Sequence, residues 1–239
     1  MKRLSGPARY RLLIGILFLL ILYYAYKSFT DYSKQLIHED QLEFAKSKGD
    51  PVLISVYYEA LCPDSKGFII NQLIPVYKRI PNLIEIEFFP YGKATTQTLP
   101  DGSLKFDCQH GERECEANII HCCAIEAIHD TETKLNVAAC MIRDNQNPKE
   151  AFQRCMREYS IDANEVETIQ KCYSSLHGKE LLKLAGEATS SLRPRVSFIP
   201  TVTLDGDQRR QATVLRDLMG EICKVLEDGG MTPKACETV

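Results

Sequence analysis

The segment Cys62-Pro63-Asp64-Ser65 holds the residues of this sequence that are best suited to chemistry. It joins a strand-like run to residues at helical spacing, so Cys62 should begin a helix, where unpaired N–H groups and a partial positive charge favour a thiolate. Pro63 fits the first helical position, because the N–H that proline lacks would have no partner there. Asp64 places a negative charge near the sulfur and acts against the thiolate. We predict that Cys62 is a nucleophile; a half-cystine or an inert helix cap is the alternative.

Ser65 lies three residues after Cys62, where a protein with two active-site thiols has its second cysteine. A hydroxyl there can donate a hydrogen bond to a thiolate, but it cannot attack a mixed disulfide. A substrate trapped on Cys62 would have to be released by an external thiol, such as glutathione or cysteine, or by another cysteine of the chain. Beyond that external reductant, no cofactor is expected.

Cysteine is the unusual residue in the composition, because all ten cysteines lie between Cys62 and Cys236. This density is typical of disulfides formed in an oxidising compartment. Structural zinc usually takes paired C-x2-C ligands, which the sequence lacks, so no metal is expected. The net charge of −3 gives no reason to expect nucleic acid as a partner.

The N-terminal part of the chain has the pattern of a targeting segment. Four basic residues precede an uncharged run from Leu12 to Tyr26, which is short for a bilayer span and at the top of the range for a signal peptide. No pair of small residues marks a cleavage site, so a single-pass signal anchor in the membrane is favoured over a cleaved signal peptide. Either one sends the cysteines across the membrane. The predicted organisation is a cytoplasmic stub and anchor or signal peptide at 1–27, a stalk at 28–50 and a folded domain at 51–239.

The elements around Cys62 follow the order strand, helix, strand. Val52–Tyr58 is a run of β-branched and aromatic residues, apolar residues then recur at helical spacing until near Pro81, and Leu83–Phe89 alternates as a second strand. Residues 93–107 are rich in Thr, Gly, Asp and Lys and are expected to form a loop.

A helical insertion is expected at about residues 108–190, because this stretch has no clear strand and holds most of the cysteines. Its clearest helical stretches are Ala117–Ile128, Lys149–Tyr159 and Ala163–Tyr173.

Strand character returns at Val196–Leu204 and is followed by an Asp205-Gly206 turn, a short return strand and a final helix from Val214 to Leu226. Pro200 is out of place in a central strand, but it suits a strand start beside an active site if its peptide bond is cis. An edge-strand proline is the alternative. The whole order predicts an α/β protein with a thioredoxin-like fold and a disulfide-rich helical insertion.

Two segments carry a resemblance to a known family. Cys108–Asn118 reads C-Q-H-G-E-R-E-C-E-A-N, which fits the signature C-Q-H-G-x-x-E-C-x-x-N at every fixed position, and Tyr57–Cys62 leads into the C-x-x-C position. The sequence therefore resembles the gamma-interferon-inducible lysosomal thiol reductases, or GILT proteins, and their GILT-like relatives. The resemblance runs from about residue 51 to Cys236.

The resemblance implies a thioredoxin-like fold and reduction of protein disulfides at acidic pH in endosomes and lysosomes, which in some members serves the immune response. Cys62 corresponds to the nucleophile and Pro200 to the active-site proline, whereas Ser65 replaces the resolving cysteine. The implied partners are disulfide-containing protein substrates, and the implied location is an endolysosomal or secretory lumen or the cell exterior. No N-x-S/T sequon occurs, so the sequence offers no site for an N-linked sorting glycan.

The signature residues Gln109-His110-Gly111 are expected to help place the disulfides, with His110 as a proton donor the alternative. The family pattern leaves eight cysteines besides Cys62 for four bridges, and Cys122 is the surplus. Cys122 could be free, pair with another chain or resolve Cys62. Cys223–Cys236 is a plausible local bridge, and the other pairings stay open. The eight cysteines are Cys108, Cys115, Cys123, Cys140, Cys155, Cys172, Cys223 and Cys236.

Three functions compete on this sequence. The first is a thiol–disulfide oxidoreductase that works through Cys62 alone. The second is a thioredoxin-like binding protein, inactive or weakly active because it has lost its resolving cysteine. The third is a structural module, which would require Cys62 to be bridged.

Overall fold

The computed structural model describes residues 20, 22–24, 26–27, 50–144 and 146–237. The chain divides into two units, Met1–Lys48 and Gly49–Val239. Most of the predicted anchor and stalk lies outside the described residues; those described at 20, 22–24 and 26–27 are helical and exposed. Within the described ranges, no helix is both long enough and apolar enough to cross a membrane.

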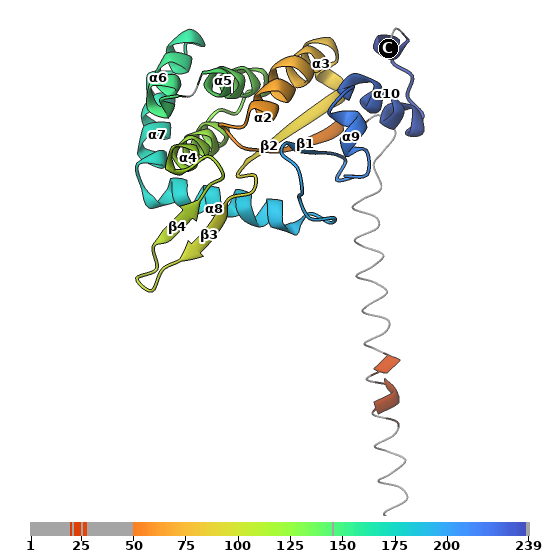
Figure 1. Ribbon diagram of the computed structural model, residues 1–239. Coiled ribbons are helices and arrows are strands. Elements are labelled where there is room, and N and C mark those ends of the chain that lie inside the picture. Colours follow the sequence, from red (N-terminus) through yellow and green to blue (C-terminus); the bar gives the residue numbers. More distant parts are fainter. Residues whose placement is uncertain (1–19, 21, 25, 28–49, 145, 238–239) are drawn as a thin grey trace, which may run out of the picture. The chain divides into compact units, whose positions relative to one another are not determined.

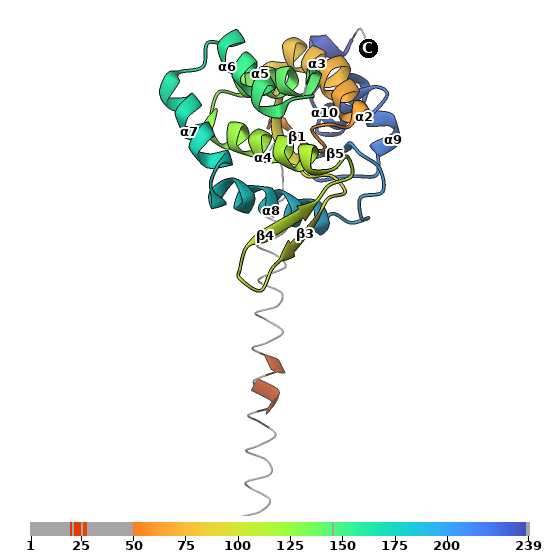
Figure 2. The same ribbon diagram turned by 60° about the vertical axis from the view of Figure 1, so that its left-hand side comes forward.

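A three-stranded sheet forms the centre of the second unit (Figure 1). Strand β1 (Val52–Tyr58) lies between β2 (Ile84–Pro90), to which it is parallel, and β5 (Thr201–Leu204), to which it is antiparallel. The central strand is almost wholly buried because its β-branched and aromatic residues face neighbours on both sides. Helices α2, α3 and α10 lie on one side of this sheet and α8 on the other (Figures 1 and 2).

The helix that follows Cys62 runs as three consecutive pieces. These are α2 (Pro63–Phe68), a π-helical turn (Ile69–Leu73) and α3 (Ile74–Arg79). Pro75 lies at the start of α3, and a proline inside a helix removes one backbone hydrogen bond. The π turn directly before it is the local irregularity that lets the helix continue. A 3-10 turn (Pro81–Leu83) then leads into β2.

The predicted loop at 93–107 is wrong. Strands β3 (Thr95–Thr98) and β4 (Leu104–Asp107) pair as an antiparallel hairpin, with Thr95 opposite Asp107. The hairpin projects from the body of the unit (Figure 1). Most of its side chains are exposed or half-buried, so it lacks the apolar alternation that marks a strand in sequence.

The helical insertion is confirmed, and it contains five helices with a core of their own. The three helical stretches named from the sequence correspond to α4, α6 and α7, and α5 and α8 were not among the named examples. Disulfides Cys123–Cys172 and Cys140–Cys155 link α4 to α7 and α5 to α6. The helices are α4 (Glu112–Ala127), α5 (Thr131–Arg143), α6 (Pro148–Glu158), α7 (Ala163–Tyr173) and α8 (Leu176–Ser191).

The C-terminal part is less regular than predicted. Strand β5 is only Thr201–Leu204, and the predicted return strand is reduced to a single bridge between Leu204 and Asp207. Asp205 and Gly206 both have positive φ, which closes the turn within two residues. The predicted final helix is split into α9 (Gln211–Val214) and α10 (Leu218–Asp228), and a 3-10 turn (Lys234–Cys236) follows.

The order β1–α2–α3–β2, then the insertion, then β5 and the C-terminal helices is a thioredoxin-like fold with a helical insert. The main core joins β1 and β2 to α2, α3 and α10. It therefore fixes the junction between β1 and α2, where Cys62 lies.

Candidate active site

Cys62 occupies the position immediately before the first residue of α2, after a three-residue loop that follows the central strand β1. Its backbone is extended, and Pro63 is the first helical residue, as the sequence predicted. The side chain is 9% exposed and takes part in no disulfide. The half-cystine alternative for Cys62 is therefore wrong. The residue lies at the N-terminal end of α2, although no N–H group of this fully described helix donates to its sulfur.

Pro200 lies beside Cys62, and its peptide bond to Ile199 is cis. The Cys62 Sγ is 3.9 Å from the Ile199 carbonyl oxygen. Gln211 holds this segment from the other side, because its Nε2 donates to the Pro200 carbonyl and its Oε1 accepts from the Val202 N–H, each at 2.8 Å. Nothing in the local sequence pattern pointed to Gln211.

Ser65 is fully buried one helical turn beyond Cys62. Its Oγ accepts a hydrogen bond from the Glu59 backbone N–H at 3.3 Å. This contact uses a lone pair of the oxygen and leaves the hydroxyl hydrogen available for donation. This hydrogen bond links Ser65 to the loop that precedes Cys62.

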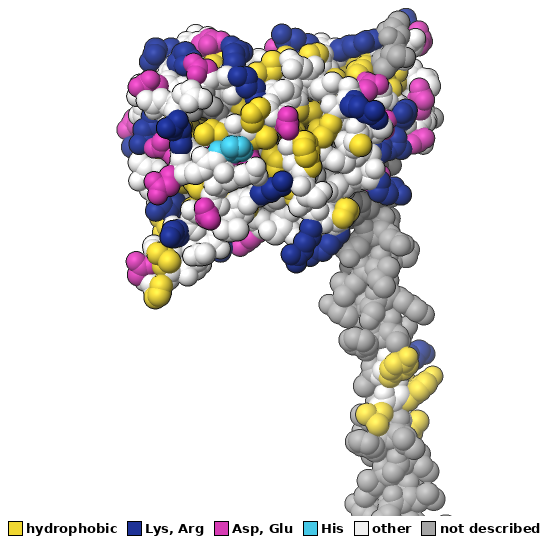
Figure 3. All heavy atoms as spheres, in the orientation of Figure 1, with side chains coloured by type: hydrophobic (Ala, Val, Ile, Leu, Met, Phe, Trp, Pro, Cys, Tyr) yellow, Lys and Arg dark blue, Asp and Glu magenta, His cyan; other side chains and the backbone are white. Residues whose placement is uncertain are grey.

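A cleft of about 370 Å³ lies next to the Cys62–Pro200 pair. Phe198 lines it and is 45% exposed. Hydrophobic side chains gather on this face of the unit, with one histidine exposed close by (Figure 3). The cleft is lined by Pro63, Asp64, Gly67, Phe68, Asn71, Gln72, Phe198, Pro200 and Leu215.

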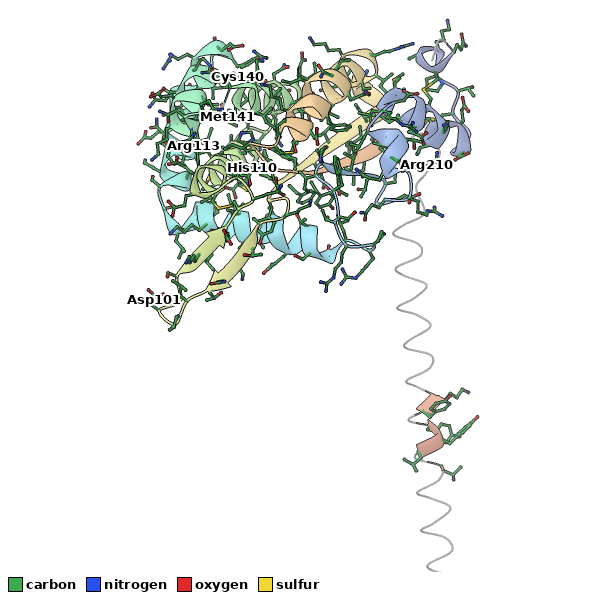
Figure 4. The ribbon with its side chains drawn as sticks, viewed as in Figure 1. Asp101, His110, Arg113, Cys140, Met141 and Arg210 are labelled. Atoms are coloured by element: carbon green, nitrogen blue, oxygen red, sulfur yellow. A yellow bond between two sulfur atoms is a disulfide. The ribbon has the colours of Figure 1, made fainter. Side chains whose placement is uncertain are left out.

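Two buried carboxyl groups and one imidazole form a cluster behind the Cys62 loop. The His110 Nδ1 lies 2.5 Å from Glu114 Oε2 and 3.5 Å from Glu59 Oε2. The side chain of Glu59 is 1% exposed and that of Glu114 is not exposed, whereas His110 reaches the surface at the start of α4 (Figure 4). Burial raises the pKa of Glu59, and the Lys93 N–H, which donates to Glu59 Oε1 at 2.8 Å, opposes that rise.

The same three side chains are close enough to hold a metal ion, since one ligand atom from each lies within 4.8 Å of the others. However, Glu59 Oε1 and Glu114 Oε1 already accept backbone N–H groups, and the imidazole contacts Glu114 Oε2 directly. Three of the four carboxylate oxygens in this cluster thus already contact nitrogen groups of the protein, which leaves few free ligand atoms for a metal ion.

Cys122 is the second free thiol, but it does not have the properties of a resolving cysteine. It is buried, and its Sγ lies 3.9 Å from the Pro90 carbonyl oxygen. Burial raises the pKa of this thiol well above its ordinary value, which disfavours the thiolate that would have to attack. We therefore reject Cys122 as the residue that resolves Cys62.

The remaining eight cysteines form four disulfides, as the count predicted. Cys223–Cys236 is confirmed as a local bridge, thirteen residues apart. Cys108–Cys115 closes a short loop around His110 and joins the end of the hairpin to α4.

Comparison with known proteins decides the family. The family model described as gamma interferon inducible lysosomal thiol reductase (GILT) matches residues 53–159. The GILT-like protein 1 of Drosophila melanogaster is 33% identical over 201 residues, which cover 77% of this chain and 78% of that protein. This chain belongs to the GILT family.

Other GILT proteins are similar over comparable lengths. The GILT-like protein of Anopheles gambiae is 34% identical over 73% of this chain and 77% of its own length. The gamma-interferon-inducible lysosomal thiol reductase of Carassius auratus is 30% identical over 80% and 74%. Among solved structures, a putative protein-disulfide isomerase from Pseudomonas syringae aligns with 77% of this chain and 96% of its own, with a TM-score of 0.47 and 12% identity. Membership of the GILT family makes the chain a thiol–disulfide oxidoreductase by class.

Proposed function

We propose that this GILT protein reduces disulfides of protein substrates through Cys62 as its single nucleophile. The observation that carries the proposal is the setting of Cys62: an unbridged cysteine at the start of α2, beside cis-Pro200, with Ser65 one turn away. Both free thiols are buried, but only Cys62 lies at a helix start, and burial raises the pKa of Cys122.

The first step is attack by the Cys62 thiolate on one sulfur of a substrate disulfide. A bond forms between Cys62 Sγ and that sulfur, the substrate S–S bond breaks, and the second substrate sulfur leaves as a thiolate that takes a proton from water. The product is a mixed disulfide. Ser65 cannot resolve it, because a hydroxyl is not a nucleophile for this exchange.

An external thiol such as glutathione completes the cycle. Its thiolate attacks the Cys62 sulfur, which releases the reduced substrate and leaves glutathione on Cys62. A second glutathione attacks the first, which yields oxidised glutathione and returns the Cys62 thiolate. Over one cycle, two external thiols are oxidised to a disulfide and one substrate disulfide is reduced to two thiols.

The cleft beside Cys62 supports a polypeptide substrate. An extended chain could lie along the Pro200 segment and cover the exposed ring of Phe198, which would remove apolar surface from water. Its disulfide would then meet Cys62 at the end of the cleft.

We place this activity in the endolysosomal or secretory lumen. Four disulfides in one domain fit an oxidising compartment, and several relatives of this chain carry the word lysosomal in their names.

The test is reduction of a protein disulfide by the purified protein at about pH 4.5 and about pH 7, with and without glutathione. We expect turnover that requires glutathione and disappears in Cys62→Ala. In Ser65→Cys we expect release of the substrate without an external thiol during the first turnover. Glutathione-dependent turnover that survives in Cys62→Ala would refute the proposal.

A binding function is the second candidate, and the buried setting of Ser65 favours it. A serine that is integrated in the loop suits a site that captures substrates without releasing them. In that case the wild-type protein would form a stable mixed disulfide, show no turnover with glutathione and gain turnover in Ser65→Cys.

A further inference from the structure

The loop between β1 and α2 is tied to the active site through the backbone of Glu59. The Cys62 N–H donates to the Glu59 carbonyl oxygen at 3.2 Å, and the Glu59 N–H donates to Ser65 Oγ at 3.3 Å. Because the two bonds join Glu59 to both ends of the C-x-x-S segment, a shift of Glu59 moves the sulfur of Cys62 with it.

The side chain of Glu59 is held by groups that are distant in the sequence. Its Oε1 accepts the Lys93 N–H, and its buried Oε2 has no hydrogen-bond partner and faces His110 Nδ1 at 3.5 Å. Gly92 leaves room for this side chain, because a methyl group there would lie 2.1 Å from Glu59 Cγ. These contacts therefore restrict the Glu59 carboxyl group to one position.

His110 is held in turn by Glu114, on the first turn of α4. Glu114 Oε1 accepts the His110 backbone N–H at 3.1 Å, and Oε2 contacts the ring Nδ1 at 2.5 Å. The Cys108–Cys115 disulfide closes the backbone around this pair, and Gly111 between them has φ of 80°. The imidazole is thus fixed against the loop by a covalently closed turn.

Asn118, one turn further along α4, makes a second link to the same loop. Its Oδ1 accepts the Ala60 N–H at 2.9 Å, and its side chain is fully buried. Two successive residues of the three-residue loop before Cys62 are therefore linked to α4: Ala60 directly through Asn118, and Glu59 through His110, which Glu114 holds.

We propose that Glu59, His110 and Glu114 are positioning residues for Cys62: they tie the loop before the nucleophile to the first turns of α4. The inference deepens the proposed function and rests on Cys62 as the nucleophile. We call these contacts between the loop and α4, made by Glu59, His110 and Glu114, the clamp. The inference gives the signature C-Q-H-G-x-x-E-C-x-x-N one role, which is to position the loop before Cys62. Its disulfide, its glycine and Asn118 either shape the clamp or contact the same loop.

The consequence for chemistry lies in the position of the sulfur. The clamp holds Cys62 at the start of α2, the end of a helix that carries a partial positive charge, with its Sγ 3.9 Å from the Ile199 carbonyl oxygen. If the loop is released, the sulfur spends less time there, and its reactivity falls. A displacement of about 1 Å can cost a factor of about a hundred in rate, so even partial release is measurable.

The experiment compares His110→Ala with His110→Asn in the full chain. Alanine removes the ring, whereas the amide nitrogen of asparagine is attached at the same place as Nδ1 and can still donate to Glu114. His177→Ala is the matched control, because His177 pairs with Glu126 at 2.7 Å on the exposed surface of the insertion, away from the loop.

Two quantities are measured for each variant. The first is the rate of alkylation of Cys62 by iodoacetamide, with the peptide identified by mass spectrometry so that Cys122 is counted separately. The second is kcat and KM for glutathione-dependent reduction of a peptide disulfide. In His110→Ala we expect both the alkylation rate and kcat to fall about tenfold with KM unchanged. His110→Asn should stay within about twofold of wild type, and His177→Ala should match wild type.

An alkylation rate in folded His110→Ala within about twofold of wild type would overturn the inference. If His110→Ala does not fold, Glu114→Gln replaces it, since the amide keeps an acceptor for the His110 N–H but removes the acceptor for the ring. Alkylation needs no turnover. A wild-type protein without reductase activity whose alkylation rate falls in His110→Ala would therefore refute the proposed function and leave the clamp standing.

Discussion

Acidification should destabilise this protein through His121, a fully buried histidine on α4. Its Nδ1 forms a 2.8 Å hydrogen bond with the Tyr58 hydroxyl group, and burial lowers its pKa to about 3. The imidazole therefore stays neutral in the folded state at pH values where an unfolded chain, with a histidine pKa of about 6.5, binds a proton. Because the unfolded state binds more protons between these two pKa values, stability falls as the pH falls through that window.

The size of the effect follows from the two pKa values. Between about pH 7 and about pH 4.5, the unfolded state gains about 2.5 kcal/mol from protonation of this one side chain, while the folded state gains almost nothing. Glu59 acts in the opposite direction, since its raised pKa gives stability at low pH that is lost as the pH rises. A variant of His121 is needed to separate the two contributions.

We expect His121→Asn to remove this acid sensitivity. The asparagine Oδ1 can accept the Tyr58 hydroxyl hydrogen and does not titrate, and the cost of the smaller side chain is the same at every pH. The measurement is urea unfolding followed by circular dichroism, with disulfides intact. Relative to wild type, the variant should gain about 2.5 kcal/mol on going from about pH 7 to about pH 4.5.

Tyr58→Phe is the control for this experiment, because it removes the hydrogen bond and leaves the histidine buried. Its free energy of unfolding should keep the wild-type dependence on pH. A constant difference between His121→Asn and wild type over the whole pH range would refute the reasoning.

Three further predictions concern the surroundings of the site. Gly92→Ala should lower the free energy of unfolding in urea by about 1–3 kcal/mol more than Gly102→Ala does. Both glycines have positive φ, but only a methyl group at Gly92 would overlap another side chain, that of Glu59. Equal decreases in the two variants would contradict this steric overlap. Gln211→Ala removes both hydrogen bonds that hold the cis-proline segment, so the free energy of unfolding should fall by about 1–3 kcal/mol; an unchanged unfolding midpoint would count against that role. In the folded protein, Cys122 should react with iodoacetamide at least about tenfold more slowly than Cys62, and the two rates should converge in urea; similar rates in the native state would show that the buried thiol is accessible.

The parts of the site that the sequence predicted are those with local signals. A run of β-branched residues, a Cys-Pro step and helical spacing predicted β1, Cys62 and α2, because strand and helix periods are visible in neighbouring residues. Pro200 was predicted for the same reason, as a proline that interrupts strand-like sequence. The number of bridges, four from eight cysteines, followed from the cysteine pattern of the family, whereas the pairings other than Cys223–Cys236 stayed open.

The parts that were missed depend on contacts between distant segments. Asn118 accepts from Ala60 across 58 positions, and Gln211 acts on the Pro200 segment from a different helix. Neither residue type nor spacing encodes such a contact. The β3–β4 hairpin was missed for another reason: its strands are stabilised by backbone hydrogen bonds, and their mostly exposed side chains carry little apolar pattern.

The burial of the four disulfides bears on the proposed reduction, because it limits access to their sulfur atoms. Seven of the eight bridged cysteines are buried and the eighth, Cys236, is half-buried. A thiolate can break a disulfide only if it reaches one of the two sulfurs. Under the proposed function, an external thiol that regenerates Cys62 should therefore react with accessible disulfides of other proteins more readily than with these buried ones. In a proposed reducing cycle, burial alone would then protect the protein's own disulfides, even though they are chemically the same as those of a substrate.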